Sequence, residues 1–417
     1  MGAIYEIGAL CALDETLVGV DFNRLTGYVG VSAGSFIAAG LANGITPREL
    51  YRSFIEDDAE AGELFSASLL MRPAWREFGR RAAALPALAA RAALQLVLHP
   101  RSPLSAVERL GSAIPSGLFS GEPMQAQLQR LFTKPGRSND FRTLKHKLVI
   151  VATDLDSGGS APFGLPGWDH VPISRAAQAS AALPGLYPPV EIDGRHFVDG
   201  ALKKTLHASV LLDEGIDLLI CLNPLVPFEA TPDRRSASPA DGGSDGGAGS
   251  TRAPRHAPLS STDERIPRLV DGGLPVVLSQ TFRSLIHSRL ELGMRGYRAS
   301  HPGVDIVLFE PDPRDTRLFL ANTFGISQRH ALAEHAYQCT RKALRARRAA
   351  LAAQLAPHGV SLDHAVLDER ERSLGGQALS PRARTARALR HLDDVLTDLE
   401  LGLGSGGVGF RAGRAPS

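Results

Sequence analysis

Apolar residues at the start of the chain recur at a helical spacing and lead into a strand. The spaced residues are Ile4, Ile7, Ala9, Leu10, Leu13, Leu17 and Val18. Side chains at that spacing line one face of a helix, so the pattern predicts a helix over residues 3–18. A short β-type run follows at residues 28–31, and a second helix begins after Gly34 and closes at Asn43 and Gly44. The chain therefore opens with a helix, a strand, a tight turn and a second helix.

Four later runs of apolar and β-branched residues predict further strands, and helical stretches separate them. The predicted strands cover residues 147–153, 195–198, 217–222 and 304–309. Longer helices are expected over residues 274–297 and 326–355. Alternating strands and helices are typical of a sheet that helices cover on both faces, so the sequence predicts the α/β fold class.

Composition predicts a break within this fold. Residues 228–264 are rich in Pro, Gly, Ser and Asp, and they carry too little apolar surface to offset the entropy lost on ordering. We interpret them as a disordered linker. The predicted organisation is a core over residues 1–204 and 205–227, the remainder of the α/β domain over 265–350, and a helical extension with a flexible tail over 351–417.

The stretch from Trp75 to Leu98 allows two interpretations. It is apolar, it is interrupted by Pro86 and Arg91, and further arginines flank it. An amphipathic segment of this composition is typical of a lid that lies in a lipid interface. The more ordinary alternative, which we expect, is a pair of helices packed in the domain.

Length and charge exclude several classes of protein. With 43% hydrophobic and 22% charged residues, the 417-residue chain has the profile of a globular protein, not of a disordered, collagen-like or multi-span membrane protein. Its 46 basic and 44 acidic side chains leave a formal charge of +2, so we expect no nucleic-acid partner. Glu6, Asp14 and Glu15 occupy the region where a signal peptide carries positive charge, which predicts a cytoplasmic location.

The spacing of the cysteines indicates neither a disulfide framework nor a metal centre. Cys11, Cys221 and Cys339 lie far apart and outside any Cys-x-x-Cys spacing. This spacing argues against disulfides and against a zinc site. We expect buried thiols and no bound metal.

A G-x-S-x-G motif joins the first predicted strand to the helix after it. Its residues are Gly30, Val31, Ser32, Ala33 and Gly34. In a nucleophile elbow of this kind, glycines flank a strained turn so that the serine Oγ projects above the sheet at a helix N-terminus. A second match at residues 242–246 lies inside the predicted linker, without a strand or helix around it. The context therefore selects Ser32 as the candidate nucleophile.

A serine nucleophile needs a base within hydrogen-bond reach, and the histidines offer none by motif. Several of them follow Ser32 in the chain, namely His99, His146, His170, His196, His207 and His287. We interpret each as structural or exposed. An α/β-hydrolase would also place several strands before its elbow, whereas Ser32 comes early in this chain.

A second signal lies further along the chain. Residues 179–190 read ASAALPGLYPPV, and Asp199, Gly200 and Ala201 follow in the segment FVDGA. The elbow, the run A-S-x-x-x-P-x-x-[FY]-P-P-V and the motif D-G-[AG], in that order, resemble the bacterial patatin-like phospholipases. The resemblance covers residues 2–225 and extends less distinctly to about residue 350.

This resemblance implies a three-layer α/β/α patatin-like sandwich with a Ser-Asp dyad and no catalytic histidine. Ser32 is then the nucleophile and Asp199 the base that takes its proton directly. Burial would raise the pKa of the Asp199 carboxyl and make it a better base. Asp154 and Asp156 are the competing acids, and they fit a structural turn better.

The family's Gly-rich loop, G-G-G-x-[RK]-G, bears on the oxyanion hole. In this resemblance Met1 falls at the basic position and Gly2 at the last glycine, so the first strand and the leading glycines fall before the first residue. We expect the natural start to lie upstream. The oxyanion donors expected within this chain are the backbone N–H groups of Ala33 and Gly2.

The resemblance implies a carboxylic ester hydrolase of phospholipase A or lysophospholipase type. Such an enzyme cleaves fatty-acyl esters of phospholipids or lysophospholipids through an acyl-enzyme, needs no metal or organic cofactor, and meets its substrate peripherally at a membrane surface. Two alternatives stay open: a small-ester hydrolase with the same dyad, and a catalytically weak or inactive patatin-like protein that binds lipid or a partner. The head group, acyl position, chain length and oligomeric state also stay open.

Overall fold

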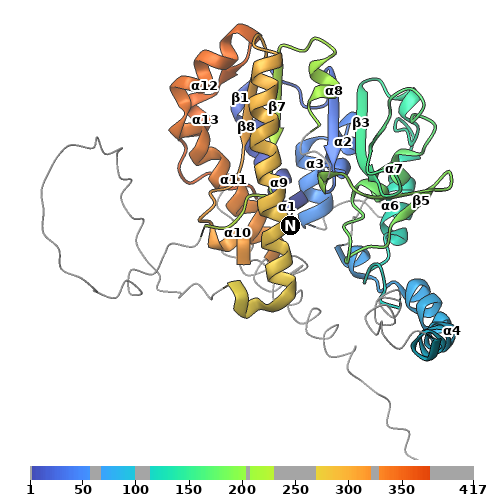
Figure 1. The fold of residues 1–417 in the computed structure, drawn as a ribbon. Helices are drawn as coiled ribbons and strands as arrows, with labels where there is room; N and C mark the ends of the chain where they lie inside the picture. The colour runs from blue at the N-terminus through green and yellow to red at the C-terminus, as the bar shows by residue number, and fades with distance from the viewer. Residues whose placement is uncertain are drawn as a thin grey trace, which may run out of the picture.

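The computed structural model describes six stretches of the chain (Figure 1), namely residues 2–56, 67–98, 113–202, 207–229, 269–320 and 328–375. Almost all of the predicted linker, the second G-x-S-x-G match and His99 lie outside the described residues. So does the predicted tail beyond residue 375.

The described elements alternate between helices and strands. The strands are β1 (Leu17–Val18), β2 (Gly27–Val31), β3 (Lys147–Asp154), β4 (Ser160–Phe163), β5 (Val190–Ile192), β6 (Arg195–Asp199), β7 (Leu218–Leu222), β8 (Asp305–Phe309) and β9 (Ser361–Leu362). The α-helices are α1 (Gly2–Thr16), α2 (Gly34–Ala42), α3 (Pro47–Tyr51), α4 (Trp75–Leu98), α6 (Glu122–Phe132), α7 (Ile173–Ser180), α8 (Ser209–Leu212), α9 (Gly273–Ser300), α10 (Thr316–Leu320), α11 (Arg329–Ala346), α12 (Arg348–Leu355) and α13 (His364–Asp368). Both the opening order of elements and the α/β class are confirmed.

The larger sheet contains the strand that leads into the elbow. Its order is β2-β3-β6-β5, and β4 pairs with β3 off that path. β2 runs parallel to β3, whereas β6 is antiparallel to it. β3 lies at the centre, between β2 and β6, and seven of its eight residues are buried. Its near-continuous run of apolar side chains is typical of a strand that is covered on both faces.

The smaller sheet, formed by β7 and β8, lies between two helical layers. Alternate residues such as Cys221 and Ile306 pack with α8 and α9 on one face. The intervening residues, such as Ile220 and Phe309, face the main core, to which α1 and α11 contribute. Since side chains alternate between the faces of a strand, this pattern gives three layers, helix, sheet and helix. In the described part of the chain, one edge of β2 and one edge of β7 have no hydrogen-bonded strand.

The C-terminal described residues, which include strand β9 and helix α13, are built into the core. β9 pairs with β1 near the start of the chain, and Leu367 and Leu374 are fully buried in the main core. The predicted helix over residues 326–355 is divided at Arg347 into α11 and α12. The predicted extension therefore begins with residues that complete the domain.

Helix α4 corrects the expected pair of packed helices. It is one helix with Pro86 inside it, and most of its described side chains are exposed. A proline removes the hydrogen bond to the carbonyl four residues earlier. That residue, Ala82, is exposed, so water can solvate its carbonyl and the helix continues through the proline.

The cysteines are free, and they differ in burial. Cys11 and Cys221 are buried as expected, whereas Cys339 is only partly buried on α11. The described residues contain no disulfide.

Arg341 on α11 is the largest fully buried side chain, and it holds the C-terminal residues in place. It donates hydrogen bonds to the carbonyls of Val366 at 2.8 Å and Glu369 at 2.6 Å. We predict that Arg341→Met lowers the free energy of unfolding by about 1 to 3 kcal/mol, because the partly buried carbonyls lose a charged donor. The exposed neighbour provides the control, since Lys342→Met should change it by less than about 0.5 kcal/mol. Equal midpoints of urea unfolding for the two variants would contradict this role.

Candidate active site

Ser32 occupies a strained turn between β2 and α2. Its φ angle of 53° lies in the left-handed region, which non-glycine residues rarely adopt. The Ser35 hydroxyl donates to the Ser32 carbonyl at 2.6 Å and fixes the turn. Gly30 is required beside it, because an added Cβ would lie 2.6 Å from Ser35 Cα. Ser32 thus lies on a tight turn that joins the end of a strand to the start of a helix.

The register of the larger sheet brings Asp199 to the level of Ser32. Val31 at the end of β2 pairs with Val151 on β3. The next residue of β3, Ala152, pairs with Asp199 at the end of β6. Ser32 follows Val31, so the serine and the aspartate face each other across β3. The two motifs lie far apart in the sequence and meet because both end on the same central strand.

The two side chains form a direct hydrogen bond. Ser32 Oγ donates to Asp199 Oδ2 at 2.5 Å, and the Ala201 N–H donates to Asp199 Oδ1 at 2.9 Å. Asp199 is 2% exposed. This burial raises the pKa of the Asp199 carboxyl to about 6, and the hydrogen bonds from Ser32 and Ala201 limit the rise. A carboxylate with that pKa is charged at neutral pH and basic enough to accept a proton from a hydroxyl.

The backbone of Asp199 is held as firmly as its side chain. Its N–H donates to the Ala182 carbonyl at 3.0 Å, and its carbonyl accepts a hydrogen bond from Thr153 Oγ1 at 3.0 Å. The next residue must be glycine, because a Cβ on Gly200 would lie 2.1 Å from the Val151 carbonyl oxygen. The D-G pair therefore marks a close approach of two strands, and the aspartate has one position relative to the elbow.

Ser180 supports the backbone of Ser32 through its hydroxyl, a role that its place in the sequence did not reveal. Its Oγ accepts a hydrogen bond from the Ser32 N–H at 2.9 Å and donates one to the Val151 carbonyl at 2.6 Å. The side chain is fully buried. The residue belongs to the A-S-x-x-x-P run that identified the family resemblance. Its hydroxyl thus links that run to the nucleophile's backbone.

Gly2 and Ala33, the predicted oxyanion donors, lie close together. A Cβ on Gly2 would be 3.2 Å from the Ala33 Cβ. Gly2 is the first residue of α1, and Ala33 is the N-cap of α2. The first backbone N–H groups of a helix have no partner within it, and they carry the positive end of its dipole. Two helix starts therefore meet beside Ser32, where they favour negative charge.

Glu6 is a second buried carboxyl near the elbow. Its Oε1 would lie 3.3 Å from a Cβ on Gly34, and its Oε2 has no hydrogen-bond partner. Burial raises the pKa of Glu6 to about 8, so this side chain is mostly neutral at pH 7. No sequence motif marks it, because a glutamate in the first turns of a helix is usually exposed.

The competing acids have other roles. Asp154 accepts a hydrogen bond from Ser157 and pairs with Arg195, and these contacts lower the pKa of its carboxyl. Asp156 accepts a hydrogen bond from the His196 N–H at 3.1 Å. Asp154 ends β3, and Asp156 lies in the turn that follows it.

Three of the histidines predicted to be structural or exposed contact residues other than Ser32 and Asp199. The His146 ring packs against Tyr28, His170 bonds Asp193, and His287 lies between Glu291 and Glu310. Ser32 and Ala201 are the hydrogen-bond donors to the Asp199 carboxylate.

The proline-rich run before Asp199 is joined to the base of α4. Tyr187 Oη donates to the Leu70 carbonyl at 2.9 Å, and the Phe119 N–H donates to the Leu186 carbonyl at 2.8 Å. In the first turn of α4, Glu77 accepts hydrogen bonds from Ser116 Oγ at 3.0 Å and from neighbouring arginines. Burial opposes ionisation of Glu77, but these hydrogen bonds lower its pKa to about 2. The exposed helix is thus anchored at one end, beside the candidate site.

Comparisons with known proteins agree with the motifs. A family model described as patatin-like phospholipase matches residues 1–212 of the 417. A solved structure, that of VipD from Legionella pneumophila, is 18% identical, with a TM-score of 0.28, and the match covers 56% of this chain and 49% of that one. The matched region spans about half the length of VipD.

Burial of Asp199 predicts that the site destabilises the fold. Because its pKa is about 6 in the folded chain and about 4 unfolded, the folded chain binds more protons between these values, and stability falls as pH rises through them. Asp199→Asn keeps the shape and removes the buried charge. We expect it to raise the free energy of unfolding by up to about 3 kcal/mol at pH 8, and by much less at pH 4.

Thermal unfolding at the two pH values provides the measurement, with Asp156→Asn in the exposed turn as the matched control. A lower midpoint for Asp199→Asn than for the parent at pH 8 would contradict the assignment of a raised pKa.

Proposed function

The chain belongs to the patatin-like phospholipase family, whose domain implies lipid acyl hydrolase activity. On that premise we propose that it hydrolyses fatty-acyl esters of phospholipids or lysophospholipids. In this proposal Ser32 is the nucleophile and Asp199 is the general base. The observation that carries this proposal is the 2.5 Å hydrogen bond from Ser32 Oγ to a carboxylate whose pKa burial raises to about 6. No histidine is needed between them, because the base is already in contact with the nucleophile.

In the proposed reaction Asp199 Oδ2 takes the hydroxyl proton while Ser32 Oγ forms a bond to the acyl carbonyl carbon. The carbonyl oxygen becomes an oxyanion, and the helix starts at Gly2 and Ala33 supply backbone N–H donors and positive dipoles for it. Collapse of this intermediate breaks the ester C–O bond, and Asp199 returns the proton to the leaving alkoxide. Water, deprotonated by Asp199, then hydrolyses the acyl-enzyme and regenerates Ser32.

We also propose that the enzyme docks on a membrane surface through α4 and α9. None of the helices in the described stretches is both long and apolar enough to cross a bilayer. α4 exposes Trp75 and Leu85, and the turn of chain that anchors it exposes Leu118. A helix with exposed apolar and basic residues, fixed at one end beside the dyad, suits contact with anionic lipid.

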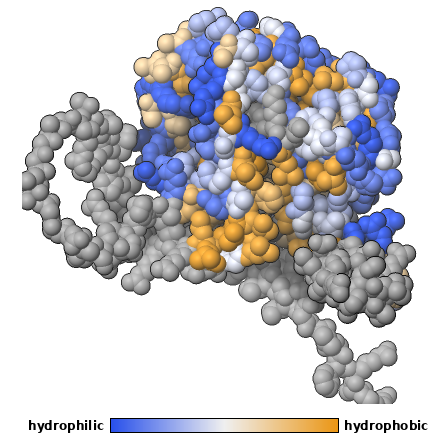
Figure 2. All heavy atoms as spheres, in the orientation of Figure 1, coloured by the Kyte–Doolittle hydropathy of each residue, from blue (hydrophilic) through white to orange (hydrophobic). Residues whose placement is uncertain are grey.

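The first half of α9 adds a second apolar surface. Figure 2 shows apolar residues gathered over this part of the molecule. The exposed members are Val270, Leu274, Val277, Leu278 and Leu285. Arg289 of α9 donates a hydrogen bond to the Leu202 carbonyl at 2.6 Å, three residues after the proposed base. In Figure 1 this end of α9 and helix α4 project toward the same side of the molecule, which favours one docking face.

We predict that release of fatty acid from phosphatidylcholine vesicles falls by a factor of about 10³ or more in Ser32→Ala and about 10² to 10⁴ in Asp199→Asn. The parent's rate should rise with pH through about 6, because only ionised Asp199 accepts the proton. Asp156→Asn should retain the parent rate. Full activity of Asp199→Asn, or no activity in a folded parent, would contradict the proposed dyad.

The docking face predicts a difference between substrates. Leu274→Glu combined with Leu85→Glu should lower vesicle binding and hydrolysis about tenfold, because charged side chains replace exposed apolar ones. Cleavage of a water-soluble short-chain ester should stay unchanged. Val18→Glu, a similarly exposed apolar residue on β1, is the control. Equal losses on both substrates would reject this face as the docking surface.

A further inference from the structure

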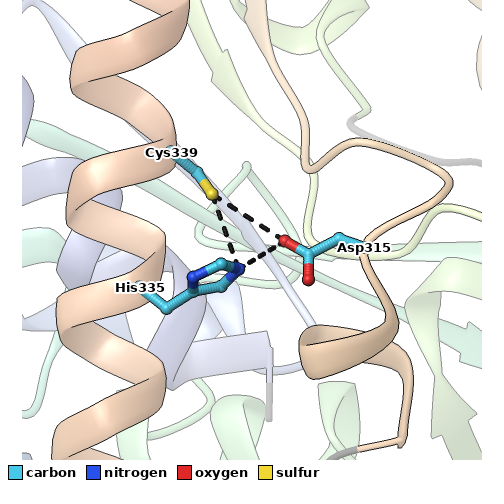
Figure 3. Close-up of side chains that lie close together, drawn as sticks. All are labelled: Asp315, His335 and Cys339. Carbon is cyan, nitrogen blue, oxygen red and sulfur yellow. Dashed lines mark hydrogen bonds and ion pairs between the residues drawn. The ribbon is translucent and has the colours of Figure 1, made fainter. Parts of the chain in front are cut away.

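Three side chains with metal-ligating atoms converge away from the dyad (Figure 3). Asp315 precedes α10, and His335 and Cys339 lie one turn apart on α11. Asp315 Oδ2 and His335 Nε2 are 2.5 Å apart, and Cys339 Sγ lies 3.6 Å from that nitrogen and 3.8 Å from that oxygen. Both neighbours therefore approach the same ring nitrogen. The arrangement differs from a catalytic triad, in which the acid and the nucleophile bond opposite nitrogens of the imidazole.

The backbone fixes the direction of all three side chains. Residues four apart on a helix lie on the same face, so His335 and Cys339 project together from α11. Asp315 faces them because its other carboxylate oxygen, Oδ1, accepts a hydrogen bond from the Leu318 N–H at 3.2 Å. α1, α10 and α11 also pack together through a buried apolar cluster that includes Tyr5, Leu318 and Leu332. The cluster is therefore held by packed elements.

The two separations that involve the sulfur are close to those of ligands around a tetrahedral metal ion. Zinc bonds of about 2.0–2.1 Å to nitrogen and 2.3 Å to sulfur place those two ligand atoms about 3.6 Å apart. Cys339 Sγ and His335 Nε2 have that separation. The Asp315 oxygen would need to retreat by about 0.8 Å to reach its tetrahedral distance of about 3.3 Å from the nitrogen. His335 is 23% exposed and Asp315 9%, so an ion can enter from solvent.

We propose that Asp315, His335 and Cys339 form a binding site for a divalent transition metal ion of the zinc type. Thiolate, imidazole and carboxylate together suit zinc or cobalt, whereas magnesium and calcium prefer oxygen ligands alone. Three protein ligands leave one position for water. A bound ion would link α11 to the segment before α10 and so stabilise the layer that packs against α1.

The competing arrangement is a simple ion pair. In the absence of metal, the hydrogen bond to Asp315 and the contact with Cys339 raise the pKa of His335 to about 10. An ion pair needs no thiol at the third corner. The two arrangements therefore differ in whether Cys339 contributes to binding.

Cobalt titration of the purified full chain, reduced and freed of metal by chelation, tests the site. We expect one equivalent of Co²⁺ to bind, with an intense thiolate-to-cobalt absorption band in the near ultraviolet and visible bands of tetrahedral cobalt. Zinc should displace the cobalt and raise the midpoint of thermal unfolding, since a ligand that binds only the folded chain stabilises it. These readouts do not depend on hydrolase activity, so they test the metal site independently of the proposed dyad.

The variants separate the site from adventitious binding. Cys339→Ser should abolish the thiolate band, and His335→Gln or Asp315→Asn should weaken zinc binding at least 100-fold. His364→Gln, an exposed histidine on α13, should bind like the parent. Absence of a thiolate band in the parent would overturn the proposal even if a variant failed to fold. Zinc affinity that is equal in the parent, Cys339→Ser and His335→Gln would also overturn it, leaving the ion pair.

Discussion

The register across β3 is the constraint on which the rest of the site depends. β2 and β6 both pair with this strand, and their pairing brings the end of one to the level of the end of the other. The hydrogen bond between Ser32 and Asp199 follows from that alignment. A shift of one residue in either pairing would turn its side chain to the opposite face of the sheet. Gly200 and the buried hydroxyls of Thr153 and Ser180 all contact residues of this register and oppose such a shift.

Burial of Asp199 in this register favours the reactivity of its carboxylate but lowers the stability of the folded chain. A carboxylate becomes a better base when it is removed from water, but the same burial makes its charge unfavourable in the folded chain. Hydrogen bonds hold both the backbone and the carboxylate of Asp199. Ser32 adds a left-handed backbone conformation of its own. The surrounding core, in which seven of the eight residues of β3 are buried, supplies the stability that these two residues reduce.

Much of this architecture could be predicted from the sequence, because its signals are local. Periodic apolar residues gave α1, and short β-type runs gave most strands within one or two residues. The G-x-S-x-G motif between a predicted strand and a predicted helix indicated Ser32, whereas Asp199 was indicated only by the resemblance to the patatin-like family. The pairing of β9 with β1 was not predictable, because two-residue strands have no periodicity. Ser180, Glu6 and the Asp315 cluster were missed because their roles arise from contacts between segments distant in the chain. The helical course through Pro86 depends on solvation of an exposed carbonyl, which composition does not reveal.

The central claim, that Asp199 activates Ser32, is tested most directly by covalent trapping. A fluorophosphonate reacts with a serine hydroxyl only when a base removes its proton, and mass spectrometry of the digested protein locates the adduct. We expect an adduct on Ser32, with a rate that rises through a pH of about 6 and falls at least 100-fold in Asp199→Asn. An adduct at another serine, or a rate of Ser32 labelling that is unchanged in Asp199→Asn, would contradict it.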